Sequence, residues 1–145
     1  MKNIKIEIPE GYQVDEAKST FTNIVFREIK KEITERIKTL QDAVDYLGED
    51  DKSVIELRKN EDSSYQQLVC IVKALNEKYI LDWGNSSERK WYSWWYLLPF
   101  RLYYVSYCNS NSDVPAALCF KSEELAEYTS KQFKDIYEQY MTNQV

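Results

Sequence analysis

The sequence predicts an α+β fold: a mostly antiparallel sheet centred on an aromatic hairpin at about 91–107, packed by helices at about 64–78 and 123–140. Two observations lead to this prediction. Nine of the 17 residues from 91 to 107 are aromatic, and aromatic side chains favour the pleated surface of a sheet. Apolar residues recur at helical spacing on both sides of this block, and strands and helices that are partly segregated along a chain favour the α+β class.

The chain has 145 residues, of which 43% are hydrophobic and 30% are charged. This composition is typical of a globular protein, and a chain of this length usually forms one domain. We therefore predict a single domain spanning residues 1–145.

The first forty residues contain two predicted strands. Residues 4–8 alternate isoleucine with charged residues, which predicts a short half-buried strand. A second strand is predicted at 21–29. The stretch 30–38 stays open between helix and strand, because isoleucines also recur there every four residues, as on one face of a helix (Ile29, Ile33, Ile37).

Capping residues mark three helices. Thr39 followed by Asp42 predicts the start of a helix over 39–47. Asp62 or Ser63 caps the helix that an apolar stripe predicts at 64–78. Ser122 before two glutamates predicts a helix over 122–140. The acidic stretch 48–63 is expected to be a loop that could hold a single helical turn at Val54–Leu57.

Pro99 divides the aromatic block into two strands, 91–98 and 101–107, and a third strand at 116–120 completes a β-meander over 91–120. Both faces of the first strand are apolar or amphipathic. Either helices bury both faces, or one face presents its aromatic side chains to a partner.

The residue inventory argues against catalysis. Histidine is absent, which excludes His-based acid–base chemistry and His metal sites. Three cysteines without a CxxC pair exclude the usual zinc and redox frameworks, and glycines only at 11, 48 and 84 exclude a phosphate-binding loop. We expect reduced thiols, although Cys108 and Cys119 could form a bridge from neighbouring strands. The sequence therefore predicts a non-catalytic protein with no cofactor and no metal.

The aromatic block supplies the candidate binding residues. Tryptophan, tyrosine and arginine dominate protein interfaces, and aromatic rings beside cations can also bind single-stranded nucleic acid. A net charge of −5 opposes nucleic acid, so a protein partner, which includes a second copy, is ranked first. The candidates are Trp83, Arg89, Lys90, Trp91, Trp94, Trp95, Tyr96 and Arg101.

The N-terminal residues lack the apolar stretch of a signal peptide, and no run of 18 apolar residues exists. We therefore expect a cytoplasmic location and no membrane partner.

Six segments together touch most of the chain: Ile6–Tyr12, Lys18–Phe21, Ile24–Phe26, Ile71–Glu77, Lys90–Tyr96 and Leu118–Ala126. These segments resemble small uncharacterised proteins of Bacteroidetes phages and mobile elements. The resemblance implies a bacterial host cytoplasm or a virion as the setting, and an accessory role for a phage or prophage. It implies no activity and no functional residues.

Overall fold

The computed structural model describes residues 4–142 and confirms the α+β class. In this range the chain forms six α-helices and two antiparallel sheets of two strands each. It divides into two compact units, one up to Glu32 and one from Ile33. Each unit is described by itself, and the single domain over residues 1–145 stays a prediction.

The N-terminal unit is built on a short antiparallel pair, β1 (Tyr12–Val14) and β2 (Phe26–Glu28). The Ser19 hydroxyl closes the connecting segment on itself just before β2, because it accepts from the Val25 N–H at 3.0 Å and donates to the Val25 carbonyl at 3.3 Å. The predicted strand over 21–29 is too long, because only Phe26–Glu28 of this stretch forms the strand that pairs with β1.

The predicted strand over residues 4–8 is wrong. These residues form no regular structure, and Ile4, Ile6 and Ile8 are exposed to solvent. Alternation of apolar and charged residues specifies which face of a strand would be buried. It does not supply the neighbouring strand whose N–H and C=O groups a sheet requires.

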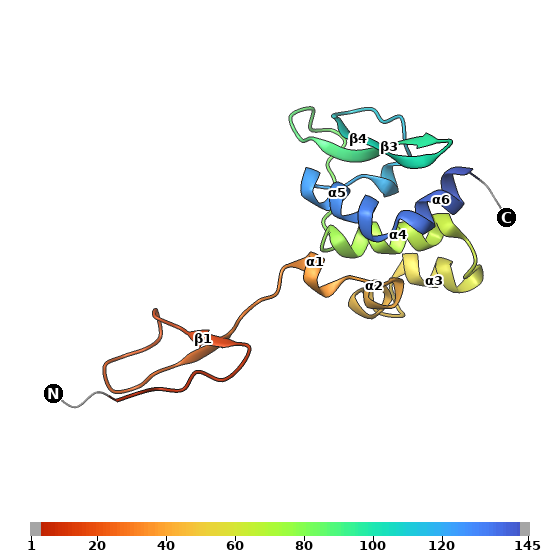
Figure 1. Ribbon diagram of the computed structural model, residues 1–145. Coiled ribbons are helices and arrows are strands. Elements are labelled where there is room, and N and C mark those ends of the chain that lie inside the picture. Colours follow the sequence, from red (N-terminus) through yellow and green to blue (C-terminus); the bar gives the residue numbers. More distant parts are fainter. Residues whose placement is uncertain (1–3, 143–145) are drawn as a thin grey trace. The chain divides into compact units, whose positions relative to one another are not determined.

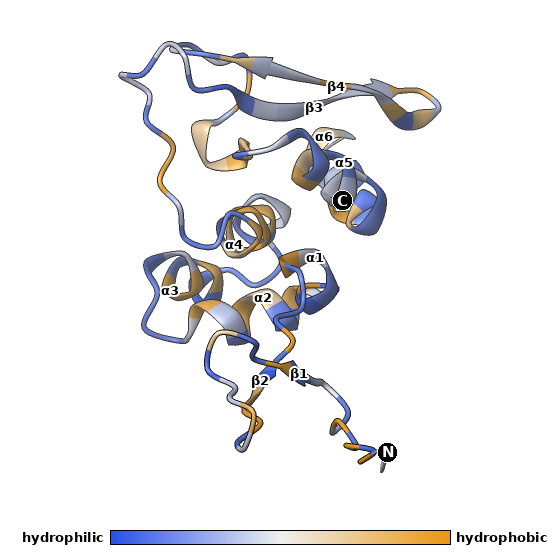
Figure 2. Ribbon diagram, turned by 90° about the vertical axis from the view of Figure 1, so that its left-hand side faces the viewer, coloured by the Kyte–Doolittle hydropathy of each residue, from blue (hydrophilic) through white to orange (hydrophobic). Residues whose placement is uncertain are grey.

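The unit from Ile33 onward is layered, and both ribbon views show the same order (Figures 1 and 2). The hairpin lies on one side, a pair of helices covers its face, and a central helix separates that pair from two shorter helices. In this order the elements are β3 (Lys90–Leu97) with β4 (Phe100–Cys108), α5 (Glu123–Gln132) with α6 (Lys134–Thr142), α4 (Ser64–Leu75), and α2 (Leu40–Leu47) with α3 (Lys52–Lys59).

Helix α4 packs mainly against α2, α3 and α6. Of the two helices predicted to pack the sheet, the C-terminal one therefore forms the layer next to the hairpin, and α4 lies one layer further away. Five residues of α4 have no measurable solvent exposure and belong to the main hydrophobic core: Leu68, Cys70, Ile71, Ala74 and Leu75.

The predicted helix over 39–47 is confirmed as α2, and its cap is reciprocal. The Thr39 hydroxyl accepts from the Asp42 N–H at 3.1 Å, and the Asp42 carboxylate accepts from the Thr39 N–H at 2.9 Å. The pKa of Asp42 is lowered mainly by the hydrogen bond from the Lys38 N–H, and further by the hydrogen bonds from Thr39. Aspartate therefore serves in the position where a capping box usually holds glutamate or glutamine.

The loop predicted for 48–63 is wrong over half its length, because Lys52–Lys59 forms α3. Asp51 caps this helix by accepting from the Ser53 N–H at 2.9 Å. Val54 and Leu57 are buried in the core cluster that also contains the apolar side of α4. The single turn that the sequence allowed at Val54–Leu57 is thus extended to a full helix, because α4 covers its two buried apolar residues. The open stretch 30–38 contains a single helical turn, α1 (Ile33–Arg36).

Helix α4 ends three residues before the predicted Lys78, because the chain turns into the left-handed region. Glu77 and Lys78 have φ values of 55° and 62°, and the Lys78 N–H donates to the Lys73 carbonyl at 3.0 Å. This bond closes the helix C-terminus. Left-handed backbone is unfavourable for any residue with a Cβ.

Lys78→Gly is expected to be more stable than Lys78→Ala by about 1 kcal/mol, because both variants lose the lysine side chain and only glycine removes the Cβ. Urea denaturation of the two variants measures the difference. Equal midpoints with equal slopes would show that the left-handed conformation costs nothing at this position.

The predicted third strand at 116–120 is wrong except at its last residue. Ala116–Leu118 forms a single 3₁₀ turn, η1. Phe120 alone joins β3, since its N–H donates to the Trp91 carbonyl at 2.7 Å and its carbonyl accepts from the Trp91 N–H at 2.8 Å. Pro115 has no N–H to donate to a ladder, and alanine has low β propensity, so the chain leaves the sheet here.

The predicted helix over 122–140 is two helices that meet at Phe133. The hydroxyls of Thr129 and Ser130 donate to the carbonyls of Leu125 and Ala126, each at 2.7 Å. Such bonds to the preceding turn bend helices, and the bend places Phe133 in the core.

Between Ile4 and Thr142, no helix has both the length and the apolar character needed to cross a bilayer.

Candidate functional site: the aromatic hairpin

The two faces of the β3–β4 hairpin differ in what covers them. The inner face lies on α5 and α6. There the Trp95 ring stacks on Phe100, with centroids 4.7 Å apart, and meets Tyr137 at 5.0 Å. The hydroxyls of Ser93 and Ser130 form a hydrogen bond of 2.5 Å between the sheet and α5. This face is part of the core.

The outer face carries a chain of aromatic rings in contact. Centroid distances are 6.4 Å for Trp94–Tyr104, 4.6 Å for Tyr104–Tyr103 and 4.5 Å for Tyr103–Tyr96. The Arg101 guanidinium ends the chain, 4.1 Å from the centre of the Tyr96 ring. We call these five residues the outer aromatic face. Its four rings are exposed by 39% to 56%.

A β-bulge assembles this face. Trp94 pairs with Tyr104, whereas the next residue, Trp95, pairs with Leu102, so Tyr103 is an extra residue in β4. A bulge sets two residues of one strand opposite one residue of the other. It thereby brings Tyr103 to the same face as Tyr104 instead of the opposite face.

The sequence left open whether helices bury both faces of the hairpin or one face presents its aromatic side chains to a partner. One face is buried, and the other is exposed over the half of the hairpin nearer its turn. At the base the outer side is covered, since Tyr92 belongs to a small buried cluster with Leu81 and Cys119.

Two of the predicted binding residues are buried. Trp95 belongs to the inner face, and Lys90 has no solvent-exposed surface. The Lys90 ammonium donates to the carbonyls of Asn85 and Glu88, each at 2.9 Å, and lies 5.5 Å from the centre of the half-buried Trp83 ring. Lys90 and Trp83 therefore hold the loop before β3.

Glu88 completes this loop. Its carboxylate accepts from the Tyr79 hydroxyl and from the Asp82 N–H, each at 2.6 Å, and lies 3.5 Å from the Lys90 ammonium. The hydrogen bond from Tyr79 is the largest influence that lowers the pKa of Glu88. The loop is therefore held by an ionised carboxylate at neutral pH.

Arg89 and Trp91 lie at the base of the inner side, apart from the outer aromatic face. The Arg89 guanidinium covers the Tyr107 ring at 4.4 Å, and Tyr107 meets Trp91 at 5.0 Å. Of the predicted residues, the structure thus brings Trp94, Tyr96 and Arg101 to one surface. Tyr103 and Tyr104, which complete that surface, were missed because no sequence signal locates the bulge.

The charge on the outer aromatic face is a single cation. Neither strand contains aspartate or glutamate, and the two basic residues of the strands are Lys90 and Arg101. Since Lys90 is enclosed, Arg101 is the charged group that β3 and β4 present to solvent. A carboxylate on a partner would complement it, because arginine binds carboxylates with two parallel hydrogen bonds.

The cysteines offer little for nucleophilic chemistry. Cys70, Cys108 and Cys119 are free thiols. Burial is the main cause that raises the pKa of Cys119 to about 11, and burial also raises the pKa of Cys70. A thiol with a raised pKa is protonated at neutral pH and is a weak nucleophile. Residues 4–142 also contain no cluster of three or more potential metal ligands of the Cys, Asp and Glu types.

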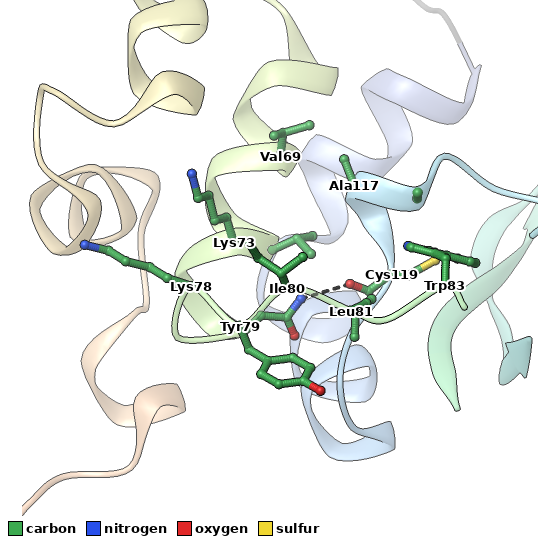
Figure 3. Close-up of a pocket in the computed structure, with 12 residues that line it drawn as sticks. Val69, Lys73, Lys78, Tyr79, Ile80, Leu81, Trp83, Ala117 and Cys119 are labelled. Carbon is green, nitrogen blue, oxygen red and sulfur yellow. Dashed lines mark hydrogen bonds between the residues drawn. The ribbon is translucent and has the colours of Figure 1, made fainter. Parts of the chain in front are cut away.

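A pocket of about 300 Å³ lies between α4, the segment after it, and η1 (Figure 3). Val69, Ile80 and Ala117 contribute apolar surface to it. Lys73 at its edge already donates to Asp51 at 2.8 Å, and Asn76 is bonded to the Cys119 carbonyl at 3.0 Å. Lys73 and Asn76 are thus used within the fold, and the pocket is lined by no carboxylate.

Comparison with known proteins identifies no relative: no family model, curated protein or solved structure matches this chain.

Proposed function

We propose that this protein is a non-catalytic binding protein whose outer aromatic face docks onto another protein. The observation that carries the proposal is the contiguous, solvent-exposed set of four rings and one arginine on the β3–β4 hairpin. With it we propose an accessory role for a phage or prophage in a bacterial cytoplasm, which rests on the sequence resemblance alone.

The chemistry of the surface supports a protein partner over single-stranded nucleic acid. Binding to nucleic acid draws its affinity from several phosphate contacts. Of the three cations near the aromatic block, Lys90 is enclosed and Arg89 covers Tyr107 on the inner side, so Arg101 alone could meet a phosphate from this face. One contact is a weak electrostatic attraction for a chain with a net charge of −5.

The same surface suits a protein partner with apolar side chains next to a carboxylate. Tyrosine and tryptophan lose little conformational freedom on binding, and here ring-to-ring contacts restrain them further before a partner arrives. The carboxylate would pair with Arg101, which is already fixed over Tyr96.

Selection from a library of random short peptides on the immobilised full chain tests the proposal. We expect enriched peptides that combine acidic and large apolar residues. Trp94→Ala and Tyr103→Ala should each weaken their binding by roughly 30-fold, the effect of an interface hot spot worth about 2 kcal/mol. Phe21→Ala removes an exposed ring from the N-terminal unit and should leave the affinity unchanged.

The contrary results are equally clear. Peptides that bind wild type, Trp94→Ala and Tyr103→Ala alike, or a selection that enriches no sequence, would contradict docking through this face. Titration with oligothymidylate at low salt tests for binding of single-stranded nucleic acid. Quenching of tryptophan fluorescence that Trp94→Ala abolishes would replace the proposed protein partner with single-stranded nucleic acid.

A further inference from the structure

The free edge of β3 opens onto a pocket, because the chain leaves the sheet at Phe120. Both backbone polar groups of Trp91 bond to Phe120. Backbone groups of alternate residues in a strand point to the same edge, so the N–H and C=O of Ser93 point the same way as those of Trp91. A continued strand would place Leu118 opposite Ser93, but Leu118 lies in η1. The ladder therefore stops one step short of Ser93.

The pocket beside Ser93 has a volume of about 150 Å³ and a mostly apolar wall, to which Trp95, Leu118, Tyr137 and Met141 contribute. We call it the β3-edge pocket. The stack of Trp95 on Tyr137, 5.0 Å between centroids, holds part of this wall in place. A cavity of about this volume accommodates one benzene-sized group, which corresponds to one leucine or phenylalanine side chain.

One charged residue, Asp113, lines the β3-edge pocket. Asp113 is exposed, and within residues 4–142 its carboxylate makes no hydrogen bond or ion pair. A cationic group in a ligand would therefore find an acceptor that is not already used by the protein.

We propose that the β3-edge pocket binds an extended peptide segment. The peptide backbone continues the ladder from Phe120 by pairing with Ser93, an apolar side chain enters the pocket, and a neighbouring basic side chain pairs with Asp113. Addition of a strand to an open sheet edge, with a pocket that reads a side chain, is a common mode of peptide recognition. This site is separate from the outer aromatic face, and it does not depend on the function proposed above.

Two capped dipeptides are matched probes: acetyl-Leu-Lys-amide and its glutamate counterpart, acetyl-Leu-Glu-amide. They are titrated into the ¹⁵N-labelled full chain and followed by NMR. The lysine probe should shift the amide signals of Ser93 and Leu118 and bind roughly two- to fivefold more tightly than the glutamate probe, the contribution of an exposed ion pair. Asp113→Asn should abolish this preference and retain binding.

Substitution at the rim controls for the site. Met141→Trp should fill the mouth of the β3-edge pocket and abolish the Ser93 shift, whereas Met141→Leu should preserve it. Phe21→Ala should have no effect, because Phe21 is exposed and does not line the pocket. The proposal is overturned if neither probe shifts Ser93, if Met141→Trp binds as wild type does, or if the shifts map to Tyr103 and Tyr104 instead.

Discussion

Phe120→Ala is expected to lower the free energy of unfolding by about 3–5 kcal/mol, the usual cost of removing a buried phenylalanine ring. Phe120 has no solvent-exposed surface and belongs to the main core. Its backbone also makes the two hydrogen bonds that join the C-terminal segment to Trp91. A cavity at this position would therefore loosen the packing around the base of the hairpin. Urea denaturation followed by far-UV circular dichroism measures the loss.

Phe21→Ala is the matched control, because it makes the same chemical change where the ring is fully exposed. We expect a change within about 0.5 kcal/mol, as for most surface substitutions. If the two variants lose similar amounts of stability, Phe120 is not in the core, and the described packing of the hairpin is wrong.

Lys90→Met is expected to cost about 2–4 kcal/mol. Methionine retains an apolar chain of similar length and deletes the ammonium, so the carbonyls of Asn85 and Glu88 each lose a charged donor that was 2.9 Å away. A hydrogen bond to a charged group contributes roughly 1.5–3 kcal/mol, and buried groups without partners are costly. The loop that Lys90 holds should open, with faster amide hydrogen exchange over 82–89 and a red shift of Trp83 fluorescence.

Lys134→Met makes the same substitution at the exposed start of α6 and should change stability by less than about 0.5 kcal/mol. If Lys90→Met behaves like Lys134→Met, the enclosed ammonium does not hold the loop. If Lys90→Met is destabilised while exchange over 82–89 stays slow, the cost arises elsewhere in the fold. Peptide affinity at the outer aromatic face should change little in either variant, because neither lysine belongs to that face.

The hairpin combines an anchored base with an exposed aromatic end. Its base is anchored by Phe120, by Lys90 and by the Ser93–Ser130 hydrogen bond, whereas the rings near its turn are free on one side. A rigid base with an exposed aromatic end limits the entropy lost on docking. Stability and binding should therefore respond to different substitutions: Phe120 and Lys90 for the first, Trp94 and Tyr103 for the second.

Features that depend on residues a few positions apart could be predicted from the sequence. The cap at Thr39 closes within three residues, the stripe along α4 repeats every turn, and Pro99 separates the two strands of the hairpin. The hydrogen bonds that form these elements lie mostly within the elements themselves. Local sequence therefore determined the α+β class, the position of the hairpin and the starts of three helices.

Features that depend on distant partners were decided by the tertiary structure. The strand expected at 4–8 has no neighbour, the strand expected at 116–120 ends where η1 begins, and α3 is stable because α4 covers Val54 and Leu57. The exposure of the outer aromatic face was also decided by the tertiary structure. Both sides of β3 are rich in aromatic residues, so composition could not say which side α5 and α6 would cover, and a bulge of one residue decided where Tyr103 points. Burial and strand pairing depend on what lies across the fold, and no short window of sequence contains that partner.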